Sequence, residues 1–130
     1  MLLDTSGLLA IHHRSEPFHA EAVDHFRVAV RRLTHNYVLA EFVALANTRG
    51  IPRQPALEYV RDILSAPHVE AVWVSIAIHN QALDLLFHRL DKTYSLCDAV
   101  SFVLMRERGI VDALTTDHHF EQEGFRRLLK

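Results

Sequence analysis

Residues 90–120, LDKTYSLCDAVSFVLMRERGIVDALTTDHHF, contain the features that decide the fold. Ser95 suits the N-cap of a helix, and Asp98 follows three residues later in the position of a capping-box acid. The predicted helix runs to Arg108 and stops at Gly109, a residue type that favours the end of a helix. This pattern predicts a helix with well-defined limits.

A short strand is expected to follow this helix directly, at residues 110–116, and to end at Asp117. The middle of the helix, residues 99–105, is apolar on nearly every face and is therefore expected to be buried. Asp98 lies on that helix and should have little access to water. Because buried carboxylates are rare unless they are paired or bind metal, Asp98 is a candidate functional group.

The whole chain, residues 1–130, is expected to form one domain with a single sizeable core. The net charge of the chain is −2, and without the four acids discussed below it would be +2. A basic surface around an acidic pocket is therefore compatible with the sequence. Cys97, the only cysteine, is expected to be a buried structural thiol, and it is compatible with a reducing compartment. No apolar run approaches the roughly 20 residues that span a membrane, and the N-terminus lacks a signal sequence, so a cytoplasmic protein is expected.

Strands and helices are expected to alternate along the rest of the chain. Asn36 and Ser75 suit helix N-caps, and Ser15 with Pro17 predicts the start of the second helix. Trp73 falls inside the clearest strand. Strands are predicted at 1–3, 33–34, 69–74 and 125–128, and helices from 5, 15, 36, 52, 76 and 118. This alternation favours an α/β layer architecture with a mainly parallel sheet.

Four acids are expected to converge at one edge of this sheet. Asp4 and Asp117 come at the carboxyl ends of two predicted strands, where sites form in parallel sheets. Glu41 and Asp98 lie early in helices that can point over the same edge, and Glu41 falls on the core face of its helix. Four converging carboxylates repel one another unless cations are bound, and hard divalent cations such as Mg²⁺ or Mn²⁺ take oxygen ligands. The pattern therefore predicts a metal site that activates water.

Each acid also has a purely structural interpretation. Asp4 can be only an N-cap, Asp98 only the acid of a capping box, and Asp117 only the cap of the short helix that follows it. Glu41 can lie at the margin of its helix with its carboxylate in water. Singly these signals are weak, and only their convergence favours a metal site.

A zinc site is not expected from the ten histidines. No two lie three or four residues apart, so no helical pair is available to one metal. The adjacent pairs, 12–13 and 118–119, cannot share a helix face.

Several motifs together resemble the PIN-domain ribonucleases, and within them the stand-alone VapC-type toxins of bacterial toxin–antitoxin pairs. The resemblance runs from residue 3 to residue 125. Its most specific parts are the segment around Asp98 and the segment that ends in Asp117. The motifs that carry it are Leu3-Asp4-Thr5-Ser6, Glu41, residues 94–101 (YSLCDAVS) and residues 113–120 (ALTTDHHF).

The resemblance implies a PIN-like three-layer α/β/α sandwich with a short, mainly parallel sheet of about four or five strands. It implies a Mg²⁺- or Mn²⁺-dependent endoribonuclease, the toxin of a toxin–antitoxin pair, which a co-expressed antitoxin inhibits and which is a homodimer. By motif position, Asp4 and Asp98 would be the principal metal ligands, and Glu41 and Asp117 would complete the catalytic and metal site. Ser6 and Thr116 would support these acids by hydrogen bonds.

Other functions remain open from the residues alone. The family also contains RNA-processing nucleases that are not toxins, and the motifs do not separate the two. A receiver domain would need an acidic pair after the first strand and a lysine after the last, whereas Asp4 stands alone there. A phosphotransferase of the DxD type would need an acid at position 6, which is Ser6. A catalytically silent RNA-binding module is a further alternative, which metal-dependent cleavage of RNA would exclude.

The early helices carry apolar side chains that exceed what one small core needs. Phe18, Phe26 and Val30 are the examples, on a stripe near the helical period. We expect that a second copy of the chain or an antitoxin helix covers some of them.

Overall fold

The computed structural model describes residues 1–130 and contains five strands and seven helices. The strands are β1 Leu2–Leu3, β2 Leu33–His35, β3 Glu70–Val72, β4 Asp112–Leu114 and β5 Arg126–Arg127. The helices are α1 Thr5–His12, α2 His19–Val28, α3 Asn36–Thr48, α4 Arg53–Ser65, α5 Ile76–Phe87, α6 Leu96–Arg108 and α7 His119–Gln122.

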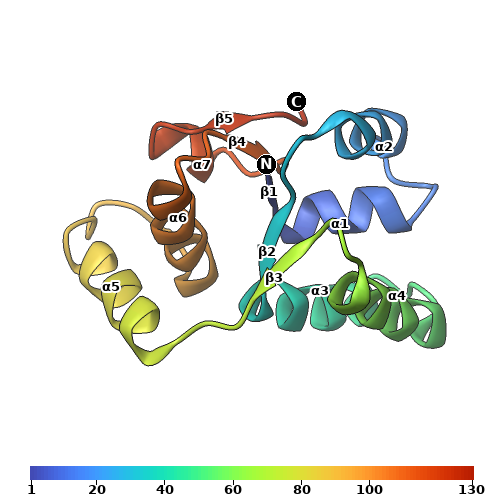
Figure 1. Cartoon of the computed structure of the whole chain (residues 1–130), viewed down its shortest axis with the longest axis horizontal. Helices are drawn as coiled ribbons and strands as arrows, with labels where there is room; N and C mark the ends of the chain where they lie inside the picture. Colours follow the sequence, from blue (N-terminus) through green and yellow to red (C-terminus); the bar gives the residue numbers. More distant parts are fainter.

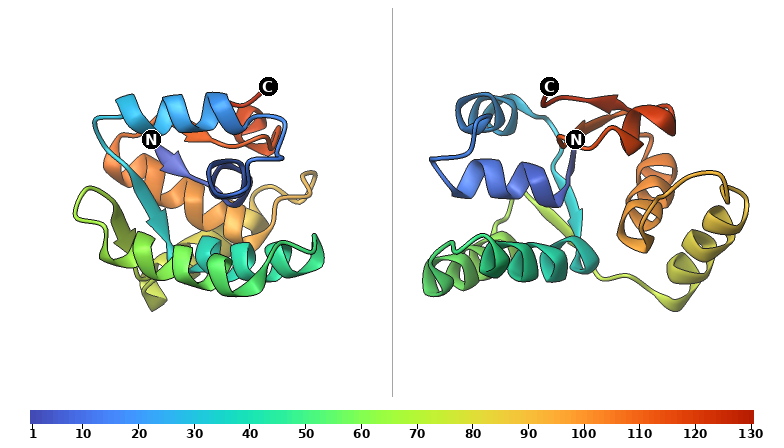
Figure 2. Two further views of the ribbon diagram at one scale, coloured as in Figure 1. Left: turned by 90° about the vertical axis from the view of Figure 1, so that its right-hand side faces the viewer. Right: turned by 180° about the vertical axis from the view of Figure 1, so that it is seen from behind.

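The five strands form one sheet in the order β3-β2-β1-β4-β5, and every pairing is parallel. Helices α1 to α4 lie on one side of the sheet, and α5 to α7 lie on the other (Figure 1). The view from behind shows the same division (Figure 2, right). The prediction of a three-layer α/β/α sandwich with a short parallel sheet is therefore confirmed.

Two hydrophobic cores, rather than the single core expected from the sequence, fill the spaces between the layers. The side chain of Leu3 packs into the core of α1 to α4, and that of Leu2 packs into the core of α5 to α7, since successive side chains of a strand point to opposite faces. Phe42 is fully buried in the first core, whereas Phe102 and Phe120 are fully buried in the second. Burial on both faces explains why β1 contains two consecutive leucines rather than an alternating pattern.

Helix α6 forms as its sequence predicts. Ser95 is the N-cap and completes a capping box with Asp98. The helix ends at Arg108, and Gly109 follows in the left-handed conformation with φ of 65°. Cys97 is buried, and burial raises the pKa of its thiol well above the usual value, as befits a structural cysteine.

Glycine at position 7 allows α1 to pack against the end of β4. A Cβ atom at Gly7 would lie 2.1 Å from the carbonyl oxygen of Leu114, far inside van der Waals contact. Only glycine permits this approach. The contact brings the segment after β1 beside the segment after β4, which are the two places where Asp4 and Asp117 occur.

Three local predictions were wrong. Helix α2 begins at His19 rather than at Ser15, because consecutive turns, from Glu16 N–H to His13 and from His19 N–H to Glu16, precede it. It also ends at Val28, so the side chain of Val30 lies beyond the helix and is 97% exposed.

The N-cap of α3 is His35 rather than Asn36. The Nδ1 atom of His35 accepts the N–H of Val38, while its Nε2 lies 2.8 Å from the Ser101 hydroxyl of α6. Asn36 instead accepts the N–H of Val74 at 2.7 Å. His35 is fully buried, and burial lowers the pKa of its imidazole to about 3, so it joins α3 to α6 as a neutral ring.

The clearest predicted strand is the edge strand β3. It pairs only with β2 and covers Glu70–Val72, so Trp73 lies outside it with 74% of its side chain exposed. The strand predicted at residues 69–74 therefore exists but is shorter, and the placement of Trp73 inside it was wrong. None of the seven helices combines the length and the hydropathy that a membrane crossing needs.

Candidate active site

Asp4 follows β1 and stands at the N-cap position of α1, but its side chain makes no capping hydrogen bond. Instead, its Oδ2 atom accepts the Thr115 hydroxyl at 2.7 Å, and the residue is only 5% exposed. The pKa of Asp4 is raised to about 7, chiefly by burial and also by the charges of Asp98 and Glu41, whereas the Thr115 hydrogen bond lowers it. The side chain therefore does not serve as a cap.

Asp98, in the first turn of α6, combines a structural contact with a place in the site. Its Oδ2 atom accepts the Ser95 N–H at 3.1 Å, as a capping box requires, and also lies 3.0 Å from Nδ1 of His119. The residue is 7% exposed, and burial raises its pKa. Both contacts involve Oδ2, so Asp98 can be a capping acid and still have a second oxygen for a ligand.

Asp117 lies after β4 and is half-buried. Its Oδ1 atom accepts the N–H of His119 at 2.9 Å, but the N-cap of α7 is His118, so the interpretation of Asp117 as that cap was wrong. Its own N–H donates to the Thr115 hydroxyl at 3.0 Å. Thr115 therefore joins the two segments that carry Asp4 and Asp117.

Glu41 is exposed rather than part of the core face of α3. The buried face of that helix consists of Val38, Leu39, Phe42 and Ala46, and Glu41 lies at its margin. The prediction of a core position was wrong, yet the side chain still borders the same cavity as the three aspartates.

A cavity of about 390 Å³ brings the four predicted acids together at the carboxyl edge of the sheet. Its lining contains no lysine, arginine or histidine, so no cation balances the carboxylates there. The other lining residues are Thr5, Ser6, Leu45, Thr93, Ser95 and Thr116. The donor set is carboxylate and hydroxyl oxygen, which fits a hard divalent cation, and the buried Thr5 hydroxyl beside Asp4 has no hydrogen-bond partner.

The supporting hydroxyl is that of Thr115, not that of Thr116. Ser6 does contribute as expected, because its hydroxyl lies 3.2 Å from that of Thr115 and accepts the backbone N–H of Thr116. Thr116 itself is exposed. Two adjacent threonines look alike in a sequence, and the path of the chain out of β4 decides which one turns inward.

His119 is the functional candidate that sequence reasoning missed. The pair at 118–119 cannot share a helix face, but it lies at the start of α7, where a turn brings donor atoms of Asp117, His118 and His119 within 4.8 Å of one another. His119 is already engaged, since Nδ1 faces Asp98 and Nε2 lies 3.1 Å from the Thr93 hydroxyl. Its position two residues after Asp117 was the available signal.

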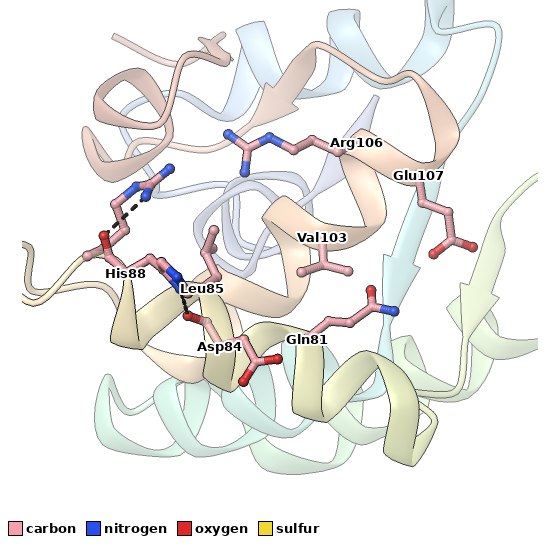
Figure 3. Close-up of a pocket in the computed structure, with 8 residues that line it drawn as sticks. Gln81, Asp84, Leu85, His88, Val103, Arg106 and Glu107 are labelled. Atoms are coloured by element: carbon pink, nitrogen blue, oxygen red, sulfur yellow. Dashed lines mark hydrogen bonds between the residues drawn. The ribbon is translucent and has the colours of Figure 1, made fainter.

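A second cavity, of about 690 Å³, lies between α5 and α6 (Figure 3). Side chains of both signs line it: Asp84 comes from α5, whereas Arg106 and Glu107 come from α6. Arg106 also binds the buried carboxylate of Glu123 at 2.6 Å. This cavity has no cluster of uncompensated acids and does not resemble a metal site.

Comparisons with known proteins agree with this geometry. A family model described as the PIN domain matches residues 1–125. Curated relatives from two strains of Mycobacterium tuberculosis, each named 23S rRNA-specific endonuclease VapC20, are 32% identical over 93 residues, which is 72% of this chain and 70% of theirs. The crystal structure of Mycobacterium tuberculosis VapC20, described as a sarcin-ricin loop cleaving toxin, matches with a TM-score of 0.89 and 27% identity, over 99% of this chain and 98% of that one.

Proposed function

The chain belongs to the PIN domain family, and from this premise we propose that it is a metal-dependent endoribonuclease that cleaves phosphodiester bonds in RNA. The observation that carries the proposal is the cavity lined by Asp4, Glu41, Asp98 and Asp117 with no basic side chain. Four carboxylates in one small space cost stability unless a cation is bound, so a purely structural role does not account for them.

Asp4 and Asp98 would hold Mg²⁺ or Mn²⁺, because they are the two most buried acids of the cavity. Glu41 and Asp117 would complete the site from its rim. A bound divalent cation supplies a water of lowered pKa and neutralises charge on phosphoryl oxygens. Thr115 keeps one oxygen of Asp4 in a hydrogen bond, which fixes how that carboxylate faces the cavity.

We further propose that the protein is the toxin of a toxin–antitoxin pair that acts in the cytoplasm. The support is the likeness to VapC20, which is described as an RNA-cleaving toxin. An antitoxin and a second copy of the chain are the expected protein partners. Phe18 and Phe26 pack partly against the protein's own core, whereas Val30 is almost fully exposed and stays a candidate contact. Further exposed apolar side chains on or beside α5 are Trp73, Ile76, Phe87 and Leu90.

Cleavage of a defined RNA tests the enzymatic proposal. The first substrate is an RNA fragment that contains the sarcin-ricin loop of 23S rRNA, because the matched toxin cleaves that loop. Purified protein should cut RNA with Mg²⁺ or Mn²⁺ and should not cut it with EDTA, and Asp98→Asn should abolish most cleavage. Metal-bound wild-type protein that cuts no RNA would support a silent RNA-binding module instead.

The neighbouring reading frame separates a toxin from a housekeeping nuclease. A toxin should be accompanied by a small gene whose product binds this protein and stops cleavage. A nuclease that remains active with every neighbouring gene product, and whose expression does not slow growth, would be an RNA-processing enzyme.

A further inference from the structure

His119 lies between two of the acids that border the cavity. Its Nδ1 atom is 3.0 Å from Oδ2 of Asp98 and 3.4 Å from Oδ1 of Asp117. Because a carboxylate only accepts hydrogen bonds, Nδ1 must carry the proton and donate it toward Asp98. The N–H group of Nδ1 therefore binds Asp98 and lies close to the carboxylate of Asp117.

The other contacts of His119 fix the orientation of the ring. Its Nε2 atom lies 3.1 Å from the hydroxyl of Thr93, in the loop between α5 and α6. The edge of the ring packs against Tyr94, with ring centroids 5.3 Å apart. The side chain is 16% exposed, so the imidazole is held on several sides rather than free to turn.

The neighbouring histidine has none of these properties. The side chain of His118 is 65% exposed, and its Nδ1 atom is 3.8 Å from Asp117, too far for a hydrogen bond. The two residues share the same chain segment and the same chemistry. His118 is thus a matched control for His119.

We propose that His119 is a positioning residue for the metal-binding carboxylates. It donates a hydrogen bond to Oδ2 of Asp98, which the Ser95 N–H also binds, and thereby fixes the carboxylate so that its second oxygen would be available to a cation. Hydrogen bonds to ligand carboxylates contribute about ten- to hundredfold to metal affinity or activity. This inference rests on the proposed function, since it assumes that the acids hold a divalent cation.

Two conservative substitutions test the proposal, because each replaces only one of the two ring nitrogens of His119 with an amide nitrogen. The amide nitrogen of asparagine occupies about the place of Nδ1, and that of glutamine about the place of Nε2. His119→Gln should raise the Kd for Mn²⁺, measured by titration calorimetry on the full chain, by roughly ten- to hundredfold. For His119→Asn and for His118→Gln, the Kd should rise by less than about tenfold, because the hydrogen bond to Asp98 is kept in both.

The metal dependence of cleavage gives a second readout. For His119→Gln, the Mn²⁺ concentration for half-maximal cleavage should rise by the same factor as Kd, and excess Mn²⁺ should restore the rate, which a folding defect would not allow. A Kd for His119→Gln equal to that of wild type, or equal losses for the asparagine and glutamine variants, would overturn the positioning role. Wild-type protein that binds Mn²⁺ but cuts no RNA would remove the proposed nuclease while leaving this inference in place.

Discussion

Two buried carboxylates, Glu123 and Asp4, have opposite surroundings. Glu123, at the end of α7, is bound by Arg89 at 2.9 Å, by Arg106 at 2.6 Å and by the hydroxyl of Tyr94 at 3.2 Å. Burial alone would raise the pKa of Glu123, but the hydrogen bonds from the two arginines hold it below the usual value. Asp4 has no cationic partner, and its pKa rises to about 7.

The difference separates a structural acid from a functional one. Glu123 joins the loop after α5, helix α6 and the turn after α7, and its charge is fully compensated. The carboxylate of Asp4 is bound by the Thr115 hydroxyl rather than by a cation, so its charge remains uncompensated. Tyr94 touches both regions, since its hydroxyl binds Glu123 and its ring packs on His119. The protein therefore combines a stabilising cluster around Glu123 with a destabilising site around Asp4, and Tyr94 connects the first to His119 in the second.

Among the variants that test the difference between Asp4 and Glu123, Asp4→Asn should have the largest effect. The amide keeps the Thr115 hydrogen bond but removes a charge from the metal site, so RNA cleavage should fall by about a thousandfold or more. The metal-free variant should also be more stable than wild type at pH 8, because an uncompensated buried charge is lost. Cleavage rate and thermal unfolding in EDTA measure both effects. An active variant with a lowered Tm would make Asp4 a structural residue.

The stability gain of Asp4→Asn should depend on pH. The pKa of Asp4 is about 7 in the folded protein and near 3.8 in the unfolded chain, so the folded state binds the extra proton between these values. Metal-free wild type should therefore lose stability relative to the variant as pH rises from about 4 to 7, by roughly 4 kcal/mol in total. Urea unfolding of both proteins in EDTA at several pH values checks this, and a difference independent of pH would contradict it.

Divalent metal should act on the Asp4 region and not on the Glu123 region. At about 100 times its Kd, Mg²⁺ or Mn²⁺ should add roughly 2.7 kcal/mol to the free energy of unfolding of wild type, because it binds only the folded site. The same gain should appear in Glu123→Gln and be absent in Asp4→Asn. Calorimetry with and without metal measures it. An unchanged Tm of wild type at saturating metal would count against the cavity as a cation site.

Glu123→Gln should have the opposite signature to Asp4→Asn. It leaves Arg89 and Arg106 without their anion, and because both arginines reach water, the free energy of unfolding should fall by less than the roughly 3–5 kcal/mol of a fully buried pair. Cleavage by the folded variant at moderate temperature should change little. A variant that loses cleavage while its Tm is kept would show that the two clusters are coupled through Tyr94.

Local sequence signals predicted much of the fold because they act within one or two turns of the chain. The capping box at Ser95 and Asp98, the helix end at Gly109 and the N-cap at Ser75 all appear in the structure. The predictions that were wrong concern residues whose neighbours lie far away in the chain. Trp73 lies beside a sheet edge, and His35 takes the N-cap of α3 while bound to Ser101 on another helix.

The sequence by itself determined which chemistry was available: four acids at helix starts and strand ends, and a parallel sheet whose carboxyl edge could gather them. Only the tertiary structure decided how each acid is held. The close approach of Gly7 to Leu114 sets Asp4 beside Thr115, and the turn at α7 brings His119 onto Asp98. These contacts join residues 21 to 111 positions apart. Their geometry depends on how helices pack on the sheet, which no local pattern of residues specifies.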